Sequence, residues 1–465
     1  MAEKFDVAIL GAGPGGYVAA LRACQLKKRV ALIEKDEVGG VCMNYGCIPT
    51  KYLLSQIKKF AALKQNKKLE GPLDKIQLNW PQVQAAKKKI VARLVKGIEF
   101  LLQRNGVTLL RGTGYLLNEN QIMVQQDKDE IKLEAARIIL APGSQPAELP
   151  FLAANGRQII TSRQALELEQ IPPKLLVIGA GVIGLEMGLV FQQIGSEVHI
   201  LEIMPSILPG SDKTLTARLE RLLRRQGLNI YTQMRIEKAK IEDKEAVLEG
   251  TCLRDNKAFN FRAEKVLMAV GRKPNLASIK NIDLGVDEKG FLEVNSFLET
   301  ETPGIFAIGD VIGGKLLAHK ASHEGLIAAE NACGQKKEMN YEALPAAVYT
   351  EPEFSMVGLS EEEATASGIK FQVGIFSLQA NGRALTMEEP EGMIKIIADD
   401  QQRIIGAHLL APNASELIAE MALAVRLGLK LEDISSTIHV HPTLSEAIME
   451  AALKAQGKAI HALNE

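Results

Sequence analysis

Residues 5–34 read FDVAILGAGPGGYVAALRACQLKKRVALIE. The apolar start predicts a buried strand, and the glycine-rich turn 11–16 follows it directly. A helical pattern comes next, and a second apolar strand ends at Glu34, which lies 23 residues after Gly11. This order of strand, glycine turn, helix, strand and acid is typical of a dinucleotide-binding unit, because the glycines admit a pyrophosphate and the acid can hydrogen-bond a ribose.

The same pattern recurs in the middle of the chain. An apolar run over 174–178 leads into GAGVIG at 179–184, and Glu202 again lies 23 residues after the first glycine, Gly179. Two such units predict two bound dinucleotides; the alternative is that the second is a glycine-rich structural turn. None of the four residues after Glu202 is Arg or Lys. Since a carboxylate repels a 2′-phosphate, the second unit favours NAD over NADP.

The composition excludes several kinds of partner. The chain has 465 residues, enough for two to four domains, and its 55 basic residues balance 56 acidic ones. This balance favours neither nucleic acid nor an anionic membrane as a partner. No apolar run reaches the roughly 18 residues of a membrane span, and no signal peptide is visible at the start. We therefore expect a cytoplasmic location, where persistent structural disulfides are rare.

Two of the five cysteines lie in GGVCMNYGCIPTK at 39–51, shortly after the first glycine turn. In a regular helix, positions five apart point about 140° away from each other. Cys42 and Cys47 can therefore form a disulfide only if the first helical turn is distorted, and the neighbouring glycines allow such a distortion. The alternative is two unrelated buried thiols. Two thiols without nearby histidines are too few for a structural zinc site, so no metal is expected.

Further strands are predicted to end at possible ligand-binding positions. A helix over 81–104, which Gly106 is placed to end, separates them from the first unit. The apolar runs 138–140, 266–270 and 304–310 predict strands, and the last of them ends at an acid. Asp310 at a strand's carboxyl end indicates a ligand contact, although a turn-forming Asp is the alternative.

The chain changes character after about residue 340. Short strands at 346–349, 371–376, 393–397 and 403–409 predict an antiparallel sheet, followed by helices over 414–427 and 444–455. The sequence thus predicts an α/β fold with two Rossmann-like dinucleotide-binding domains and a C-terminal α+β domain.

The last helix is preceded by the motif HVHPTLSEA at 439–447. An imidazole is a suitable base for a thiol because its ordinary pKa is about 6.5, and a nearby carboxylate would orient it. Two readings of Glu446 remain open. It can orient His441, or it can close a capping box with Thr443 at the N-cap and itself at N3.

With these residues assembled, the chain resembles the flavoprotein disulfide reductase family over essentially its whole length. The resemblance rests on 39–51, on GAGVIGLEMG at 179–188, and on the motifs VGRKPN (270–275), FAIGDV (306–311), LAHKA (317–321) and HVHPTLSEA. It implies an FAD domain over 1–147, an NAD domain over 148–272, a return segment over 273–340 and a dimerisation domain over 341–465. It also implies a homodimer in which each active site is completed by the other subunit.

The resemblance assigns roles residue by residue. Cys42 is similar to the family's interchange thiol and Cys47 to its charge-transfer thiol. Lys51 and Glu186 resemble an ion pair near the flavin N5, and His441 resembles an acid–base oriented by Glu446. The remaining implied cofactor contacts are, for FAD, Gly11, Gly13, Gly16, Glu34, Lys51, Gly114, Ser144, Asp310, Leu317, Ala318 and His319, and for NAD, Gly179, Gly181, Gly184, Glu186, Glu202 and Gly271.

The activity that the resemblance implies is oxidation of dihydrolipoyl groups to lipoyl by NAD, through a Cys42–Cys47 disulfide and FAD. Its implied partners are lipoyl-bearing proteins of 2-oxo acid dehydrogenase or glycine cleavage complexes. Two alternatives remain. One is a glutathione-type reductase, for which cationic residues would be expected after the second glycine turn. The other is a flavin-containing docking subunit without obligatory turnover, which would need neither the cysteines nor His441.

Overall fold

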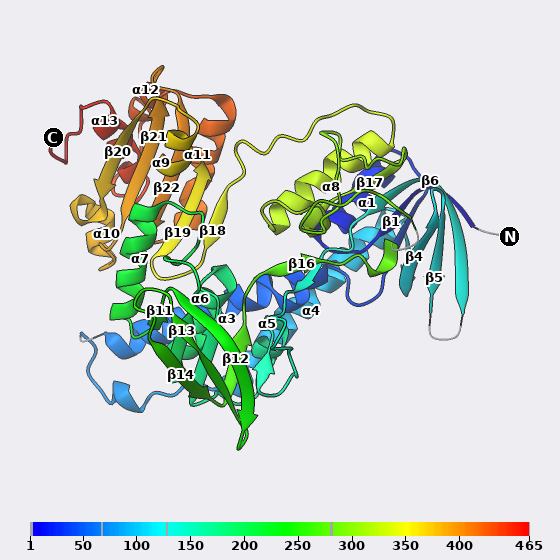
Figure 1. Ribbon diagram of the computed structural model, residues 1–465. Coiled ribbons are helices and arrows are strands. Elements are labelled where there is room, and N and C mark those ends of the chain that lie inside the picture. Colours follow the sequence, from blue (N-terminus) through cyan, green and yellow to red (C-terminus); the bar gives the residue numbers. More distant parts are fainter. Residues whose placement is uncertain (1–2, 67, 127–128, 280–281, 465) are drawn as a thin grey trace. The chain divides into compact units, whose positions relative to one another are not determined.

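The computed structural model describes residues 3–66, 68–126, 129–279 and 282–464. They form two compact units, shown in Figure 1. The first comprises 1–149, 161–170 and 270–339, and the second comprises 150–160, 171–269 and 340–465. The segment 161–170 is grouped with the first unit, although it lies in the range 148–272 of the predicted NAD domain, and that domain division stays a prediction.

The first unit is built on a seven-stranded sheet. Its strands lie in the order β3 (Thr108–Arg111), β2 (Val30–Glu34), β1 (Glu3–Leu10), β6 (Glu130–Leu140), β5 (Gln121–Gln125) and β4 (Thr113–Asn118), with β17 (Ile305–Ala307) also paired to β6. Strands β1, β2, β3, β6 and β17 run parallel, whereas β4 and β5 join antiparallel. The short strands β7 (Ser144–Pro146) and β16 (Arg272–Pro274) pair separately.

Helices follow the parallel strands of this unit. They are α1 (Pro14–Gln25), α2 (Gly40–Tyr45), α3 (Cys47–Gln65), α4 (Trp80–Arg104), α5 (Ser162–Leu166) and α8 (Ala318–Ala332), with 3-10 turns η1 (Leu73–Lys75), η2 (Ala277–Ile279) and η3 (Gly309–Ile312). The helix predicted over 81–104 is confirmed as α4, and Gly106 follows its end with φ +77°. Alternate residues of β1 enter opposite cores: Val7 and Ile9 contact the α1, α4 and α8 side, and Ala8 and Leu10 the β4–β5 side.

The second unit contains a parallel sheet and two antiparallel sheets. The parallel sheet has the order β11 (Asn229–Tyr231), β10 (Glu197–Leu201), β9 (Lys174–Ile178), β15 (Lys265–Met268) and β8 (Ile159–Ile160). Helices α6 (Val182–Gln193) and α7 (Lys213–Arg225) accompany it, and β12 (Met234–Glu242), β13 (Glu245–Cys252) and β14 (Ala258–Ala263) form the smaller antiparallel sheet. The second βαβ unit predicted from the sequence is confirmed.

The C-terminal part of the second unit is an antiparallel sheet accompanied by helices. Its strands are β18 (Ala346–Val348), β19 (Glu353–Gly358), β22 (Ile404–Ala411), β21 (Met393–Asp399) and β20 (Phe371–Ser377), in that order. Its helices are α9 (Glu361–Ala366), α10 (Gly382–Thr386), α11 (Ala414–Leu427), α12 (Leu431–Ser435) and α13 (Glu446–Ala455), with η4 (Leu378–Ala380). The sheet shares one hydrophobic core with α10, α11, α12 and α13. The antiparallel sheet is confirmed, but β19 was not predicted.

Several boundaries differ from the predictions, and the strand predicted over 304–310 is only β17, which ends at Ala307. Strand β6 begins at Glu130 rather than 138, because its mostly polar first half pairs antiparallel with β5 and has no apolar run to mark it. Strand β15 ends at Met268, two residues early. Helix α13 begins at Glu446 with Ser445 at its N-cap, so Thr443 is not the N-cap of this helix.

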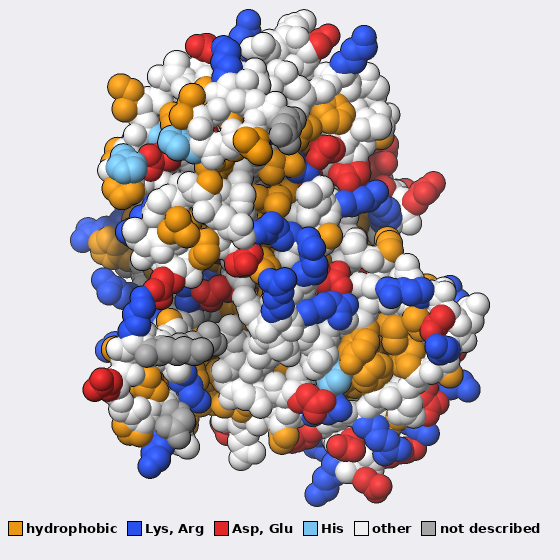
Figure 2. Space-filling view, turned by 90° about the vertical axis from the view of Figure 1, so that its left-hand side faces the viewer, with side chains coloured by type: hydrophobic (Ala, Val, Ile, Leu, Met, Phe, Trp, Pro, Cys, Tyr) orange, Lys and Arg blue, Asp and Glu red, His pale blue; other side chains and the backbone are white. Residues whose placement is uncertain are grey.

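The surface carries both charges and scattered apolar side chains. On the face drawn in Figure 2, acidic and basic side chains are spread among hydrophobic ones. Within the described ranges, no helix is long and apolar enough to cross a bilayer. The same part of the chain holds no group of three or more His, Cys, Asp or Glu side chains arranged to bind a metal.

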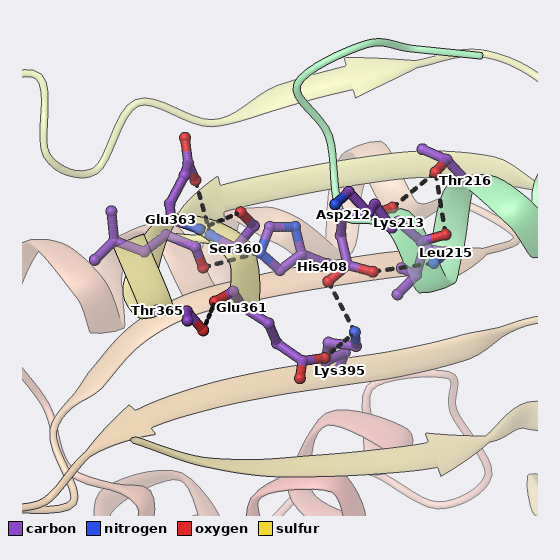
Figure 3. A network of polar contacts seen from close by, with 11 residues as sticks. Asp212, Lys213, Leu215, Thr216, Ser360, Glu361, Glu363, Thr365, Lys395 and His408 are labelled. Atoms are coloured by element: carbon purple, nitrogen blue, oxygen red, sulfur yellow. Dashed lines mark hydrogen bonds and ion pairs between the residues drawn. The ribbon is translucent and has the colours of Figure 1, made fainter. Parts of the chain in front are cut away.

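A buried histidine makes stability depend on pH. His408 of β22 donates from Nε2 to the Leu359 carbonyl at 3.0 Å, and its Nδ1 has no hydrogen-bond partner among the described residues. Burial lowers the pKa of His408, and the Lys395 ammonium of β21 adds to this effect. The hydrogen bond to Leu359 opposes it, as do the carboxylates of Asp212, the N-cap of α7, and Glu363 of α9 (Figure 3).

We therefore expect stability to fall as the pH drops through the ordinary histidine pKa, because the unfolded chain then binds a proton that the folded chain does not. The limiting slope is about 1.4 kcal/mol per pH unit. The check is the Tm of the holoenzyme between pH 7.5 and 5.5, compared with His408→Gln, whose amide can still donate to Leu359. Parallel curves for the two proteins would contradict the assignment.

Candidate active site

The two cysteines of 39–51 lie on either side of a break between helices. Helix α2 ends at Tyr45, α3 begins at Cys47, and Gly46 between them has φ −144° and ψ −107°. A Cβ on Gly46 would lie only 3.0 Å from the Val41 carbonyl oxygen. The expected distortion of the helix is confirmed, and it lets side chains five positions apart meet.

The Cys42 side chain makes a hydrogen bond with Cys47. That hydrogen bond, followed by burial and by the negative charge of the Cys47 sulfur, raises the pKa of Cys42 above the ordinary thiol value. The Cys47 N–H and the Lys51 ammonium act in the opposite direction without cancelling the effect. A raised pKa keeps the Cys42 thiol protonated near neutral pH, so a base is needed to ionise it.

This pair lies directly beside the first glycine turn. The Gly39 N–H donates to the Ala12 carbonyl at 2.8 Å. Gly40 has φ +57°, and a Cβ on it would lie 2.8 Å from the Cα of Gly13. Only a glycine allows this approach, so the start of α2 is fixed against the turn that opens α1.

The two glycine turns have nearly the same geometry. Gly11 and Gly179 adopt φ +99° and +103°. A Cβ on Gly16 would lie 1.8 Å from the Gly11 carbonyl oxygen, and a Cβ on Gly184 would lie 1.9 Å from that of Gly179. Each turn therefore closes tightly onto the first turn of its helix, as the sequence repeat predicts.

Each turn is bonded to the buried acid at the end of the second strand. Glu34 accepts the Ala12 N–H at 2.7 Å, and Glu202 accepts the Ala180 N–H at 2.6 Å. The second oxygen of each carboxylate accepts another backbone N–H, two residues further along the chain, at 2.8 Å. Each oxygen keeps a second lone pair for a ribose hydroxyl.

The residues present fit a pyrophosphate at both turns. A Cβ on Gly13 or on Gly181 would meet no atom within 4 Å, so space is open in front of each helix. Within the described residues, neither α1 nor α6 has a side chain capping its first N–H groups. Uncapped N–H groups at a helix start, facing open space, are suited to an anion.

A polar cluster joins Ser144 and Asp310, both expected at the FAD site, to a third residue. The Ser144 hydroxyl donates to Asp310 Oδ2 at 2.5 Å, and Arg272 donates to the Ser144 hydroxyl at 2.7 Å and to its carbonyl at 2.8 Å. Burial lowers the pKa of the Arg272 guanidinium, and the negative charges of Asp310 and Cys47 oppose that shift. A partly buried cation thus lies within electrostatic range of both Asp310 and the Cys47 thiol.

The start of α8 lies next to the same cluster in the chain. Leu317 is its N-cap, Ala318 and His319 open the helix, and no side-chain hydrogen bond caps it among the described residues. One turn on, Lys320 bonds Glu324 at 2.7 Å, and Glu324 accepts the Gly309 N–H at 2.7 Å. This buried pair ties the helix start to the turn that carries Asp310.

Four other predicted site residues are divided between the two units. Gly114 in β4 leaves room for Leu10, whose Cδ2 would lie 2.2 Å from an added Cβ. Glu186, buried on α6, accepts the Tyr349 N–H at 2.9 Å within the second unit. Lys51 and Gly271 belong to the first unit. The predicted Lys51–Glu186 ion pair, and the grouping of Gly271 with the other NAD residues, therefore stay predictions.

A histidine–carboxylate pair lies before α13. His441 Nδ1 is 2.8 Å from Glu446 Oε1, and the other oxygen of Glu446 accepts the Thr443 N–H at 2.7 Å. Both interpretations of Glu446 are thus partly right. One carboxylate oxygen contacts the imidazole, and the other accepts the Thr443 N–H, as a capping box would require. Burial disfavours the Glu446 carboxylate, but the Thr443 and His441 bonds outweigh it and lower the pKa of Glu446.

The neighbouring histidine is placed differently. Both ring nitrogens of His439 are engaged, Nε2 with Glu420 at 3.0 Å and Nδ1 with the Thr437 carbonyl at 2.9 Å, and its side chain is buried. The His441 side chain is 79% exposed. His441 is therefore the ring of this motif that can meet a substrate or another chain.

A chain that holds two dinucleotide turns and places a pair of thiols beside the first of them belongs to the class of oxidoreductases that move electrons between nicotinamide and sulfur. The pyridine nucleotide-disulphide oxidoreductase model matches residues 5–325, and the dimerisation-domain model of the same family matches 344–452. The chain belongs to the pyridine nucleotide-disulphide oxidoreductase family. It is accordingly an oxidoreductase that uses FAD and NAD.

Individual relatives cover the whole chain. Dihydrolipoyl dehydrogenase 3 of Haloarcula marismortui is 40% identical and aligns with 99% of this chain and 98% of its own length. Dihydrolipoyl dehydrogenase of Staphylococcus aureus is 39% identical, with 98% of each chain aligned. Among solved structures, LpdA of Mycobacterium tuberculosis has a TM-score of 0.89 at 27% identity, covering 97% of this chain and 99% of its own. The HOCl-induced flavoprotein disulfide reductase RclA of Escherichia coli has a TM-score of 0.83 at 26% identity, covering 95% and 98%. The predicted fold class is confirmed.

Arg272 is a site residue that the sequence patterns did not indicate. It stands one position after Gly271, in the quoted motif VGRKPN. A basic residue just after the carboxyl end of a parallel strand is a possible ligand contact, because ligands bind at that edge of the sheet. Only the structure shows that Arg272 donates to Ser144, 128 positions earlier.

Proposed function

We propose that this chain is a dihydrolipoyl dehydrogenase, which oxidises dihydrolipoyl groups to lipoyl with NAD. The contact between Cys42 and Cys47 beside the first glycine turn is the observation that carries the proposal. The dihydrolipoyl dehydrogenases that align over almost the whole chain support it.

In the oxidised enzyme, the substrate dithiol attacks a Cys42–Cys47 disulfide. One substrate thiolate forms a bond to the Cys42 sulfur, the Cys42–Cys47 bond breaks, and Cys47 leaves as a thiolate. The second substrate thiolate then closes the lipoyl ring and displaces Cys42. When bound, FAD would supply the two-electron acceptor between the resulting Cys42–Cys47 dithiol and NAD. Arg272 is a cation that interacts favourably with the negative charge of Cys47, and the Lys51 ammonium favours ionisation of Cys42.

A base is needed because the substrate thiols and Cys42 carry protons. We assign this role to His441, oriented by Glu446 at 2.8 Å. In the proposed homodimer, the partner subunit's His441 serves the thiols of this subunit. The exposed ring and the match to the family's dimerisation domain support this arrangement. The predicted division at 147, 272 and 340 is part of the same proposal.

The macromolecular partners we propose are lipoyl-bearing proteins of 2-oxo acid dehydrogenase or glycine cleavage complexes, and the location we propose is the cytoplasm. A docking subunit without turnover is disfavoured because it would not need the thiol pair and the His441–Glu446 pair. Reduction of free lipoamide by NADH, one equivalent for one, tests turnover directly. A Cys42→Ala variant should not reduce lipoamide, and equal rates in wild type and Cys42→Ala would contradict the proposal.

A glutathione-type reductase is the rival within the family. The residues after Glu202 disfavour this alternative. Ile203 and Met204 are 52% and 46% exposed and offer no cation to a 2′-phosphate.

We expect Glu202→Arg to reduce the preference for NADH over NADPH by about 10- to 100-fold, since a repelling carboxylate is replaced by a phosphate-binding guanidinium. The measurement is kcat/KM with each nucleotide. Glu197→Arg, a surface change at the start of the same strand, is the matched control and should leave the ratio unchanged. An unaltered ratio in Glu202→Arg would contradict the assignment of Glu202.

A further inference from the structure

The second unit contains a fully buried ammonium that the proposed chemistry does not use. Lys395 lies in the middle of β21 with 0% of its side chain exposed. Its Nζ bonds Asp212 Oδ2 at 2.8 Å and also contacts Glu361 (Figure 3). A buried ammonium is costly unless it is paired, so these two carboxylates hold its position.

Asp212 is engaged on both carboxylate oxygens. It is the N-cap of α7, and its Oδ1 accepts the Leu215 N–H at 3.0 Å while Oδ2 meets Lys395. Only 1% of its side chain is exposed. The start of α7 is thereby fixed to the C-terminal sheet through one side chain.

Asp212 ends the loop that Glu202 begins. Near its start, Glu202 bonds the Ala180 N–H, and further on the Leu208 N–H donates to the Ala180 carbonyl at 3.0 Å. Ala180 lies inside the second glycine turn, so the loop is bound there twice. The Met204 carbonyl also accepts the Gln233 N–H at 3.1 Å, and the far end of the loop is fixed at Asp212, which Lys395 holds.

The loop needs this restraint. Leu208 adopts φ +45°, a left-handed conformation that is unfavourable for a residue with a side chain. Such a conformation persists only where the surrounding contacts enforce it. Releasing Asp212 would therefore let the loop relax away from the glycine turn.

We propose that Lys395 is a positioning residue for the NAD site, acting through Asp212 on the loop 203–211 that borders the adenosine ribose. This inference rests on the proposed NAD role of Glu202. Lys395 itself touches no nucleotide; its ion pair sets where the loop lies, and so how well the adenine dinucleotide binds.

The variants Lys395→Met and Asp212→Asn test this in the full-length, FAD-loaded protein. Asn can still accept the Leu215 N–H, so it keeps the cap of α7 and loses only the charge. We expect either change to raise the KM for NAD about tenfold, because a displaced loop weakens ground-state binding. The kcat and the KM for dihydrolipoamide should stay within about twofold.

Glu361→Gln is the matched control, since Glu361 contacts the same ammonium but leads into α9 rather than the loop. It should leave the KM for NAD unchanged. The double variant Lys395→Met with Asp212→Asn should raise the KM for NAD no more than either single variant does, because both changes break the same Lys395–Asp212 ion pair. A rise of similar size in Glu361→Gln, or additive effects in the double variant, would overturn the proposal.

Calorimetry with ADP-ribose separates this inference from the proposed function, because it requires no turnover. Weaker ADP-ribose binding in Asp212→Asn than in wild type supports the positioning role, even if wild type fails to oxidise dihydrolipoamide. Equal ADP-ribose affinity in wild type, Asp212→Asn and Lys395→Met would overturn it. If Lys395→Met fails to fold, Asp212→Asn still tests the proposal, because Lys395 in that variant keeps its ion pair with Glu361.

Discussion

Replacing Cys47 by Ser is expected to lower NAD-dependent oxidation of dihydrolipoamide by more than about 10³-fold. A serine hydroxyl cannot form a disulfide with Cys42 and does not ionise near neutral pH, so the thiol exchange has no acceptor. The loss should appear in kcat at saturating substrate, while nucleotide binding is kept. The measurement is steady-state turnover together with the FAD content of the purified variant.

Cys252→Ser is the matched control for this prediction. Cys252 ends β13 in the second unit, whereas both site cysteines belong to the first. Its replacement should leave turnover within about twofold of wild type, as for a surface or half-buried change away from the site. Substantial turnover in Cys47→Ser would contradict the disulfide relay.

The second large effect is expected at His441. His441→Gln should reduce turnover about 10²- to 10⁴-fold, the range for removing a general acid–base group. Glu446→Gln should have a smaller effect and should alter the pH profile. Its amide can still accept the Thr443 N–H, but it no longer places a negative charge 2.8 Å from the imidazole. Both variants are measured as kcat against pH.

His461→Gln provides the control for both variants. His461 Nδ1 lies 2.7 Å from Glu450 Oε1, so the same kind of pair is disrupted outside the motif 439–447. Near-normal turnover is expected there. A normal pH profile in Glu446→Gln would show that the carboxylate acts only on the Thr443 N–H.

Local patterns in the sequence predicted the parts of the fold that depend on neighbours in the chain. Both βαβ units follow from apolar runs and glycine turns, and the break at Gly46 follows from the helical angle between Cys42 and Cys47. The missed elements lack such a signal. The first half of β6 is polar on one side, and β19 is a short strand that only its pairing with β22 defines.

The site divides in the same way. Gly13, Glu34 and the two cysteines could be found from spacing, because the contacts they make lie within about forty residues of chain. Arg272 and Lys395 could not, since each acts on a residue more than a hundred positions away: Ser144 for the first and Asp212 for the second. Their polarity is visible in the sequence, but burial and partner are not.

Anaerobic titration of the FAD-loaded enzyme with NADH, followed by visible absorption, tests the central claim most directly. If electrons from NADH reach the Cys42–Cys47 pair, a long-wavelength band from the Cys47 thiolate against the flavin should grow in during the titration and be missing in Cys47→Ser. Flavin bleaching without that band in wild type, or the same band in Cys47→Ser, would contradict the account.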